Sequence, residues 1–157
     1  MRLLRAADHR RMAWKNGGGE TAEIAVSPAS ASLEALDWRL SMARVASDGP
    51  FSTFPSVDRT LAILDGAGLR LTVGRDTRVL TRESAPLAFP ADVATDSLLL
   101  DGPVTDLNVM TRRGRYAHTV ERIALTRPVA LDVRGDVVAV LCVDGRIGCD
   151  VDGRPAA

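Results

Sequence analysis

The stretch WRLSMARV, residues 38–45, alternates between two kinds of side chain. One set is large and apolar, Trp38, Leu40 and Met42, and the other is small or polar, Arg39, Ser41 and Ala43. Because successive side chains of a strand point to opposite faces, this pattern predicts a β-strand with one apolar and one polar face. In a sandwich the polar face would meet solvent, whereas in a barrel-like roll it would turn toward a cavity.

Strand signals recur along the 157 residues, and helical periodicity is nearly absent. The clearest further runs are ETAEIAVS, DRTLAILDG, LRLTVG, LLLDG, TDLNVM, ALDV and VVAVLCVDG. The segments around Asp65-Gly66 and Asp144-Gly145 each read as strand, hairpin turn, strand and closing glycine. Chance likeness between two hairpins would explain this, and so would an internal repeat that forms two β-roll halves of jelly-roll or cupin type. The chain is therefore expected to be all-β.

The charge balance gives no support to a nucleic-acid or membrane partner. Lys and Arg number 20, Asp and Glu number 20, and the net charge is zero. The one basic cluster, TRRGR at 111–115, is interpreted as a solvated turn. No signal segment and no apolar run of membrane-spanning length occurs, so we expect a cytoplasmic protein. The two histidines, His9 and His118, form no HxH pair, so neither a metal nor another cofactor is expected.

The stretch AWKNGGGET at 13–21 raises the question of a phosphate loop. A P-loop carries its lysine after the glycines and opens a helix, whereas Lys15 precedes them and TAEIAV reads as a strand. The contiguous glycines also lack the spacing of a dinucleotide motif. Glycines at a strand entrance let a ligand or a neighbouring strand approach the backbone. Two interpretations stay open: a packing bulge beneath Trp14, or a space lined by Lys15, Asn16 and Thr21.

Two other segments suggest a pocket. TDLNVM puts Asp106, Asn108 and Met110 on one strand face, and hydrogen-bonding side chains on an inward face need partners. A ligand would satisfy them, although the same face could instead meet solvent. The segment DGPFSTFPSVDR at 48–59 has no regular period, and it would either form a pocket wall or plug one end of a barrel.

Four blocks together resemble the HutD/Ves family: WKNGGGETAEI, WRLSMA, DGPFSTFPSVDR and DLNVMTRRG, in the family's order. The resemblance implies a bicupin-like β fold without the metal ligands of classical cupins. It also implies an association with histidine utilisation, in which the protein acts as a small-molecule-responsive governor. Family members usually run longer than this chain. We therefore expect a first cupin-like half over residues 1–115, which carries the pocket, and a shortened second half over 116–157.

The leading functional hypothesis is a binding site for a small carboxylate metabolite, with an intermediate of histidine breakdown, such as urocanate or a formylated or formimino glutamate, as the candidate. The predicted site comprises Trp14, Lys15, Asn16, Gly17, Gly18, Thr21, Ser41, Phe51, Ser52, Asp106 and Asn108. The lysine would supply charge, the asparagines would recognise amide or carboxylate groups, the hydroxyl residues would add hydrogen bonds, and the two aromatic residues would form an apolar wall. The glycines would open the space.

The alternative is a metal-independent isomerase or hydrolase that acts on a similar acid. Asp106 or Asp58 would be its general base, and Lys15 would stabilise an oxyanion. A third hypothesis is an interaction module whose polar face meets a protein partner. Edge strands left by a short second half also favour a homodimer.

Overall fold

The computed structural model describes residues 2–15, 17–151 and 154–155. The chain divides into two compact units, Arg5–Arg122 and a second unit made of Met1–Leu4 with Ile123–Ala157. The predicted division into halves at residues 1–115 and 116–157 stays a prediction. No helix in the described part of the chain is long and apolar enough to cross a membrane.

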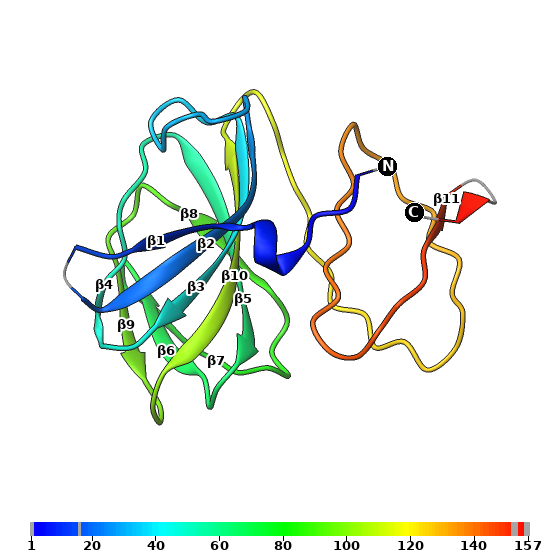
Figure 1. Cartoon of the computed structure of the whole chain (residues 1–157). Coiled ribbons are helices and arrows are strands. Elements are labelled where there is room, and N and C mark those ends of the chain that lie inside the picture. Colours follow the sequence, from blue (N-terminus) through cyan, green and yellow to red (C-terminus); the bar gives the residue numbers. More distant parts are fainter. Residues whose placement is uncertain (1, 16, 152–153, 156–157) are drawn as a thin grey trace. The chain divides into compact units, whose positions relative to one another are not determined.

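The Arg5–Arg122 unit consists of two antiparallel sheets that face each other (Figure 1). Sheet A has the strand order β1 (Arg10–Ala13), β2 (Gly19–Ser27), β3 (Trp38–Val45), β10 (Val104–Arg112), β5 (Val57–Asp65) and β8 (Leu87–Pro90). Sheet B has the order β4 (Gly49–Pro50), β9 (Thr95–Leu99), β6 (Leu69–Val73) and β7 (Asp76–Leu80). A 3-10 turn, η1 (Ala6–Asp8), precedes β1. The expected all-β roll is confirmed.

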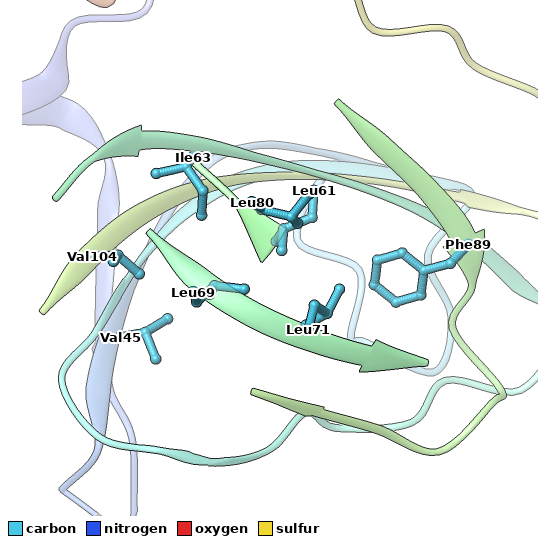
Figure 2. Close-up of a cluster of buried hydrophobic side chains, with 8 residues drawn as sticks. All are labelled: Val45, Leu61, Ile63, Leu69, Leu71, Leu80, Phe89 and Val104. Carbon is cyan, nitrogen blue, oxygen red and sulfur yellow. The ribbon is translucent and has the colours of Figure 1, made fainter. Parts of the chain in front are cut away.

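The space between the sheets holds an apolar core at one end. Its buried members are Val45, Leu61, Ile63, Leu69, Leu71, Leu80, Phe89 and Val104. Figure 2 shows these side chains, from strands of both sheets, directed into the shared interior. Burial of each large apolar side chain contributes about 1.5–3 kcal/mol, so this core joins the two sheets.

The polar face of WRLSMARV points into this interior, so the barrel-like alternative is the one that the protein adopts. Arg39, Ser41 and Ala43 are buried, whereas Trp38, Leu40 and Met42 are only partly buried on the outer face. The polar face of TDLNVM also turns inward rather than to solvent, with Asp106 only 1% exposed. In this rolled sheet the inner face carries polar as well as apolar residues, because it contains the candidate site beside the core.

The hairpin predicted at Asp65-Gly66 is wrong. The strands on either side, β5 and β6, lie in different sheets, and the intervening turn crosses between them. Gly66 and Gly68 both have positive φ, and a Cβ at Gly66 would lie 2.6 Å from the carbonyl oxygen of Pro103. The glycines serve this close backbone crossing and not a two-residue hairpin.

The second unit contains the short pair β11 (Asp150–Val151) and β12 (Arg154–Pro155). The strands predicted at ALDV and VVAVLCVDG, and the Asp144-Gly145 hairpin, are absent from its described residues. The physical reason is that no sheet face buries their alternating apolar side chains, since Val133 is 55% and Val140 60% exposed.

The TRRGR cluster ends β10 and continues into an exposed turn at residues 113–115, as interpreted, but two of its arginines also bond to neighbouring segments. Arg113 contacts both Asp58 and Asp92 at 2.9 Å, and the Arg113 hydrogen bond lowers the pKa of Asp92. Arg112 donates hydrogen bonds to three carbonyl oxygens, those of Glu34, Leu36 and Pro55. The two arginines tie the end of β10 to the loops around it.

Candidate functional site

The inner face of sheet A carries seven polar residues beside the apolar core, and we call them the interior polar cluster. They are Thr21 and Glu23 from β2, Arg39 and Ser41 from β3, Arg59 from β5, and Asp106 and Asn108 from β10. Each takes its place from strand alternation and from the pairing register. Ser41, for example, pairs with Asn108 on one side and Glu23 on the other.

Two shifts in strand register lie beside the interior polar cluster. The register between β2 and β3 shifts between Glu23 and Ala25. The register between β10 and β5 shifts between Thr105 and Asp106. A bulge bends its strand and redirects the neighbouring side chain, and such bulges are common beside functional sites. The first shift puts an extra residue in β2 beside Glu23, and the second puts one in β5 opposite Asp106, while β10 itself stays in regular register with β3.

A hydrogen-bonded relay connects a cation to an anion through an amide. The guanidinium of Arg59 donates to Asn108 Oδ1 through both Nε, at 2.6 Å, and Nη2. Asn108 Nδ2 in turn donates to Asp106 Oδ1 at 2.5 Å. The relay leaves two groups without hydrogen bonds to described residues: Arg59 Nη1 and the buried Asp106 Oδ2. A buried acceptor without a partner is rare and points to an absent ligand or proton.

The electrostatics of the relay favour less charge than its residues carry in water. Burial raises the pKa of Asp106 to about 7, although the charge of Arg59, the Asn108 hydrogen bond and a weaker backbone hydrogen bond from Ala43 oppose the rise. Burial also lowers the pKa of Arg59 to about 10. The guanidinium lies 4.6 Å above the ring of Phe51 and 5.8 Å from that of Phe89, so aromatic faces replace part of its hydration. Arg59 therefore stays cationic at neutral pH, whereas the pKa of Asp106 lies close to neutral pH.

A second charge pair completes the cluster. Arg39 Nε donates to Glu23 Oε2 at 2.7 Å, and both side chains are largely buried, at 8% and 12% exposure. Each charge compensates the other in a medium where an isolated charge would be costly. Arg59 is the cation whose charge acts on the Asp106 carboxyl group.

The glycine stretch forms the hairpin loop between β1 and β2. Trp14 N donates to Gly19 O at 2.9 Å, and Trp14 Nε1 donates to Thr21 Oγ1 at 2.8 Å. A Cβ at Gly19 would collide with the carbonyl oxygen of Arg44 and lie 3.0 Å from the Trp14 ring. Gly17 has φ +70°, which favours glycine in the turn. The observed contacts are those of the packing interpretation, in which Gly19 makes room for the indole.

The predicted site residues divide into two groups. Ser41, Asp106 and Asn108 meet in the interior, Thr21 lines it, Trp14 binds Thr21, and Phe51 covers Arg59. Lys15, Gly17 and Ser52 are exposed, and the carbonyl of buried Gly18 accepts from Ala46 N at 2.8 Å. Asn16 lies outside the described residues. The structure thus brings only part of the predicted set together, and ligand binding by these residues stays a prediction.

Sequence reasoning missed three charged members of the cluster: Glu23, Arg39 and Arg59. A signal for Arg59 was available, because alternation in VDRTLAILD places it on the same face as Leu61 and Ile63. A charge on an otherwise apolar strand face implies a buried partner. That partner, Asn108, lies 49 positions away in the sequence.

A separate pocket of about 340 Å³ lies on the outer face of sheet A. It is lined by Asp58, Arg59, Thr60, Ala88, Phe89, Pro90, Thr111, Ala117 and His118. His118 is partly buried there, and its Nε2 and Nδ1 lie 2.8 Å from the hydroxyls of Thr60 and Thr111. Burial lowers the pKa of His118. This imidazole holds the segment after β10 against the sheet, with both ring nitrogens occupied.

Within the described residues, no three His, Cys, Asp or Glu side chains gather as a metal site. A second, water-sized cavity of about 20 Å³ has Trp14 and Phe51 among its lining residues. Phe51 covers one face of the Arg59 guanidinium, and Arg59 also lines the pocket of about 340 Å³. A ligand would reach the guanidinium at its Nη1 edge or after movement of Phe51.

Comparisons with known proteins place this geometry in a family context. The HutD family model matches residues 6–157. An uncharacterized 21.2 kDa protein in the hutC 3′ region of Pseudomonas putida is 40% identical over 117 residues, which cover 74% of this chain and 60% of that one. Protein Ves of Citrobacter koseri is 36% identical over 137 residues, which cover 86% of this chain and 70% of that one.

Among solved structures, HutD from Pseudomonas fluorescens SBW25 is 40% identical, with a TM-score of 0.63 over 69% of this chain and 58% of that one. The chain spans about three-fifths of the length of the Pseudomonas putida relative. Solved structures of low identity share the cupin-like β-roll alone.

Proposed function

The chain belongs to the HutD family, and on that premise we propose that its β-roll binds a small carboxylate metabolite at the interior polar cluster. The observation that carries the proposal is the relay of Arg59, Asn108 and Asp106, which leaves Arg59 Nη1 and Asp106 Oδ2 without hydrogen bonds to described residues. A guanidinium is the side chain best suited to carboxylates, because it offers parallel N–H donors in one plane.

The neighbouring groups support the binding of a small anion such as a carboxylate. Asn108 holds the guanidinium in one orientation, which lowers the entropy lost when an anion binds. Phe51 and Phe89 lie against the cation and exclude water, so that a charge–charge contact there is stronger than at the surface. The hydroxyls of Thr21 and Ser41 supply further polar contacts on the same inner face.

The physiological role that we propose is modulation of histidine utilisation in the cytoplasm. It rests on the names of the relatives, since one is described from the hutC 3′ region and another is HutD itself. The candidate ligands are urocanate, formiminoglutamate and formylglutamate, each of which carries a carboxylate. Formate is a useful minimal probe, because the Pseudomonas fluorescens structure is described for a formate condition.

A thermal-shift screen of these four compounds tests the proposal. A ligand present at about 100 times its dissociation constant adds about 2.7 kcal/mol to the free energy of unfolding, which raises the melting temperature measurably. The Arg59→Met variant is expected to lose the shift, and Arg113→Met, which removes an exposed cation from the outer face, is expected to retain it. A folded protein whose melting temperature none of the four compounds changes would disprove the proposed binding.

Asp106 favours a second candidate function, a metal-independent isomerase or hydrolase. Its pKa of about 7 and its unpartnered Oδ2 suit a general acid or base at neutral pH. Lys15 is an exposed loop residue, and Asp58 is on the opposite face, paired with Arg113. If the enzyme hypothesis holds, Asp106→Asn abolishes turnover of a histidine-pathway acid while the thermal shift survives. Turnover that persists in this variant rules out Asp106 as the base.

A further inference from the structure

Asp106 is the acidic group closest to the proposed ligand position, and its environment is unusual. Its carboxyl group is 1% exposed, Oδ1 accepts from Asn108, and Oδ2 has no hydrogen-bond partner. Regular alternation along β10, which pairs in unbroken register with β3, directs the side chain into the interior. An ionised carboxylate with a dry, unpaired oxygen is costly, whereas a protonated Oδ2 becomes a donor that awaits an acceptor.

The charged groups around Asp106 come from three strands. Arg59 on β5 reaches it through Asn108, and its positive charge favours the ionised carboxylate. Arg39 on β3 is paired with Glu23 on β2, so these two charges offset each other. Sheet B presents only uncharged buried side chains to the interior, Leu69, Leu71, Thr95 and Ser97. Arg59 is therefore the cation that keeps Asp106 ionised.

An anion at Arg59 would change this balance. Its charge would offset the guanidinium, and its oxygens would lie in the same buried region as the carboxylate of Asp106. Two carboxylates that share a buried site do not both stay ionised, because their repulsion raises the pKa of one of them. The least costly arrangement is one proton held between them, as a short O–H···O hydrogen bond.

We propose that a carboxylate ligand enters this interior together with one proton, which Asp106 Oδ2 takes up from solvent and donates to the ligand. This inference rests on the proposed carboxylate binding at Arg59, and it makes the binding pH-sensitive. Above the pH at which free Asp106 ionises, the apparent affinity falls about tenfold per pH unit, and below that pH it is constant.

Isothermal titration calorimetry of the full chain with formate and with N-formylglutamate measures the proton directly. At each pH, titrations in two non-carboxylate buffers of different ionisation enthalpy, such as HEPES and Tris at about pH 8 and MES and piperazine at about pH 5.5, give the number of protons taken up per ligand bound. We expect close to one proton at about pH 8 and close to none at about pH 5.5, where Asp106 is already protonated. Saturable binding with no uptake at about pH 8, or with proton release, overturns the proton coupling and leaves carboxylate binding intact.

Two variants test whether Asp106 is the group that takes up the proton. Asp106→Asn is expected to bind with no proton uptake and no pH dependence, because its amide donates without titration. The matched control Asp58→Asn removes a carboxylate from the opposite face of the same sheet and is expected to leave uptake unchanged. Uptake that persists in folded Asp106→Asn overturns the assignment. If that variant does not fold, the proton uptake of the wild type across pH decides whether binding is coupled to a proton. The absence of saturable heat with both ligands at every pH overturns this inference and the proposed function together.

Discussion

The indole ring of Trp14 lies against the backbone of Gly19. Its Cε3 and Cζ3 atoms would be 3.0 Å from a Cβ at that position, and Trp14 N donates to Gly19 O at 2.9 Å. Thr21, two residues further, accepts from the indole nitrogen. The missing side chain of Gly19 therefore allows one aromatic residue to close the β1–β2 hairpin over the interior.

Gly19→Ala is expected to destabilise the protein by about 1–3 kcal/mol, because the added methyl group overlaps the carbonyl oxygen of Arg44 and crowds Trp14. Chemical denaturation measures the change in the free energy of unfolding. Gly148→Ala is the control, since a Cβ there has open space and the backbone φ is not positive. Equal stability of the two variants would contradict the packing role of Gly19.

The buried pair of Arg39 and Glu23 should show strong coupling in a double-mutant cycle. Arg39→Met leaves the largely buried carboxylate of Glu23 with only the more distant Arg10, at 4.0 Å, and is expected to cost about 3–5 kcal/mol. The double variant Arg39→Met with Glu23→Met should lose less than the single one, because it removes both charges. Urea denaturation of the four proteins gives the coupling energy, and additive effects would show that the pair is not coupled.

Stability should fall as pH rises through the titration of Asp106. The folded-state pKa of about 7 exceeds the ordinary value of 3.8, so the folded protein binds more protons between these limits. The contribution to stability is present below about pH 4 and is lost progressively up to about pH 7. The difference in unfolding free energy between wild type and Asp106→Asn isolates this effect. A difference that does not vary from about pH 4 to 8 would show that Asp106 has an ordinary pKa.

Arg59→Met should raise the pKa of Asp106 further, since Arg59 is the principal group that opposes the effect of burial. The carboxyl ¹³C shift of Asp106, followed by NMR across pH, reports this pKa. Arg113→Met serves as the control, because Arg113 pairs with Asp58 and Asp92. An unchanged titration in Arg59→Met would mean that the charge of Arg59 does not influence the pKa of Asp106.

His118→Ala removes two hydrogen bonds, to Thr60 and Thr111, and should cost about 1 kcal/mol for each. Amide hydrogen exchange in residues 116–122 should accelerate, because the imidazole holds this segment on the outer face of sheet A. Exposed Thr119 provides the matched control, and Thr119→Ala should change stability by less than about 0.5 kcal/mol. Unaltered exchange in His118→Ala would assign the anchoring to other contacts.

Several features of the site could be predicted from the sequence because they depend on local periodicity. The alternation in WRLSMARV and TDLNVM identified which side chains share a face, and Ser41, Asp106 and Asn108 do meet inside the roll. Consecutive glycines indicate a close backbone approach from the local sequence alone, so AWKNGGGET correctly indicated a strand entrance. The four family blocks likewise predicted the roll without any knowledge of strand order.

Other features depend on contacts between residues far apart in the chain, and only the tertiary structure decides them. Whether the polar face of β3 meets solvent or interior depends on the closure of two sheets. The Asp65-Gly66 turn is compatible with a hairpin by sequence, but its strands enter different sheets. Local sequence determined each strand's two faces, since side-chain direction alternates along any strand. The tertiary structure decided that Arg59 reaches Asn108 across 49 positions, because such a pairing depends on strand order and register.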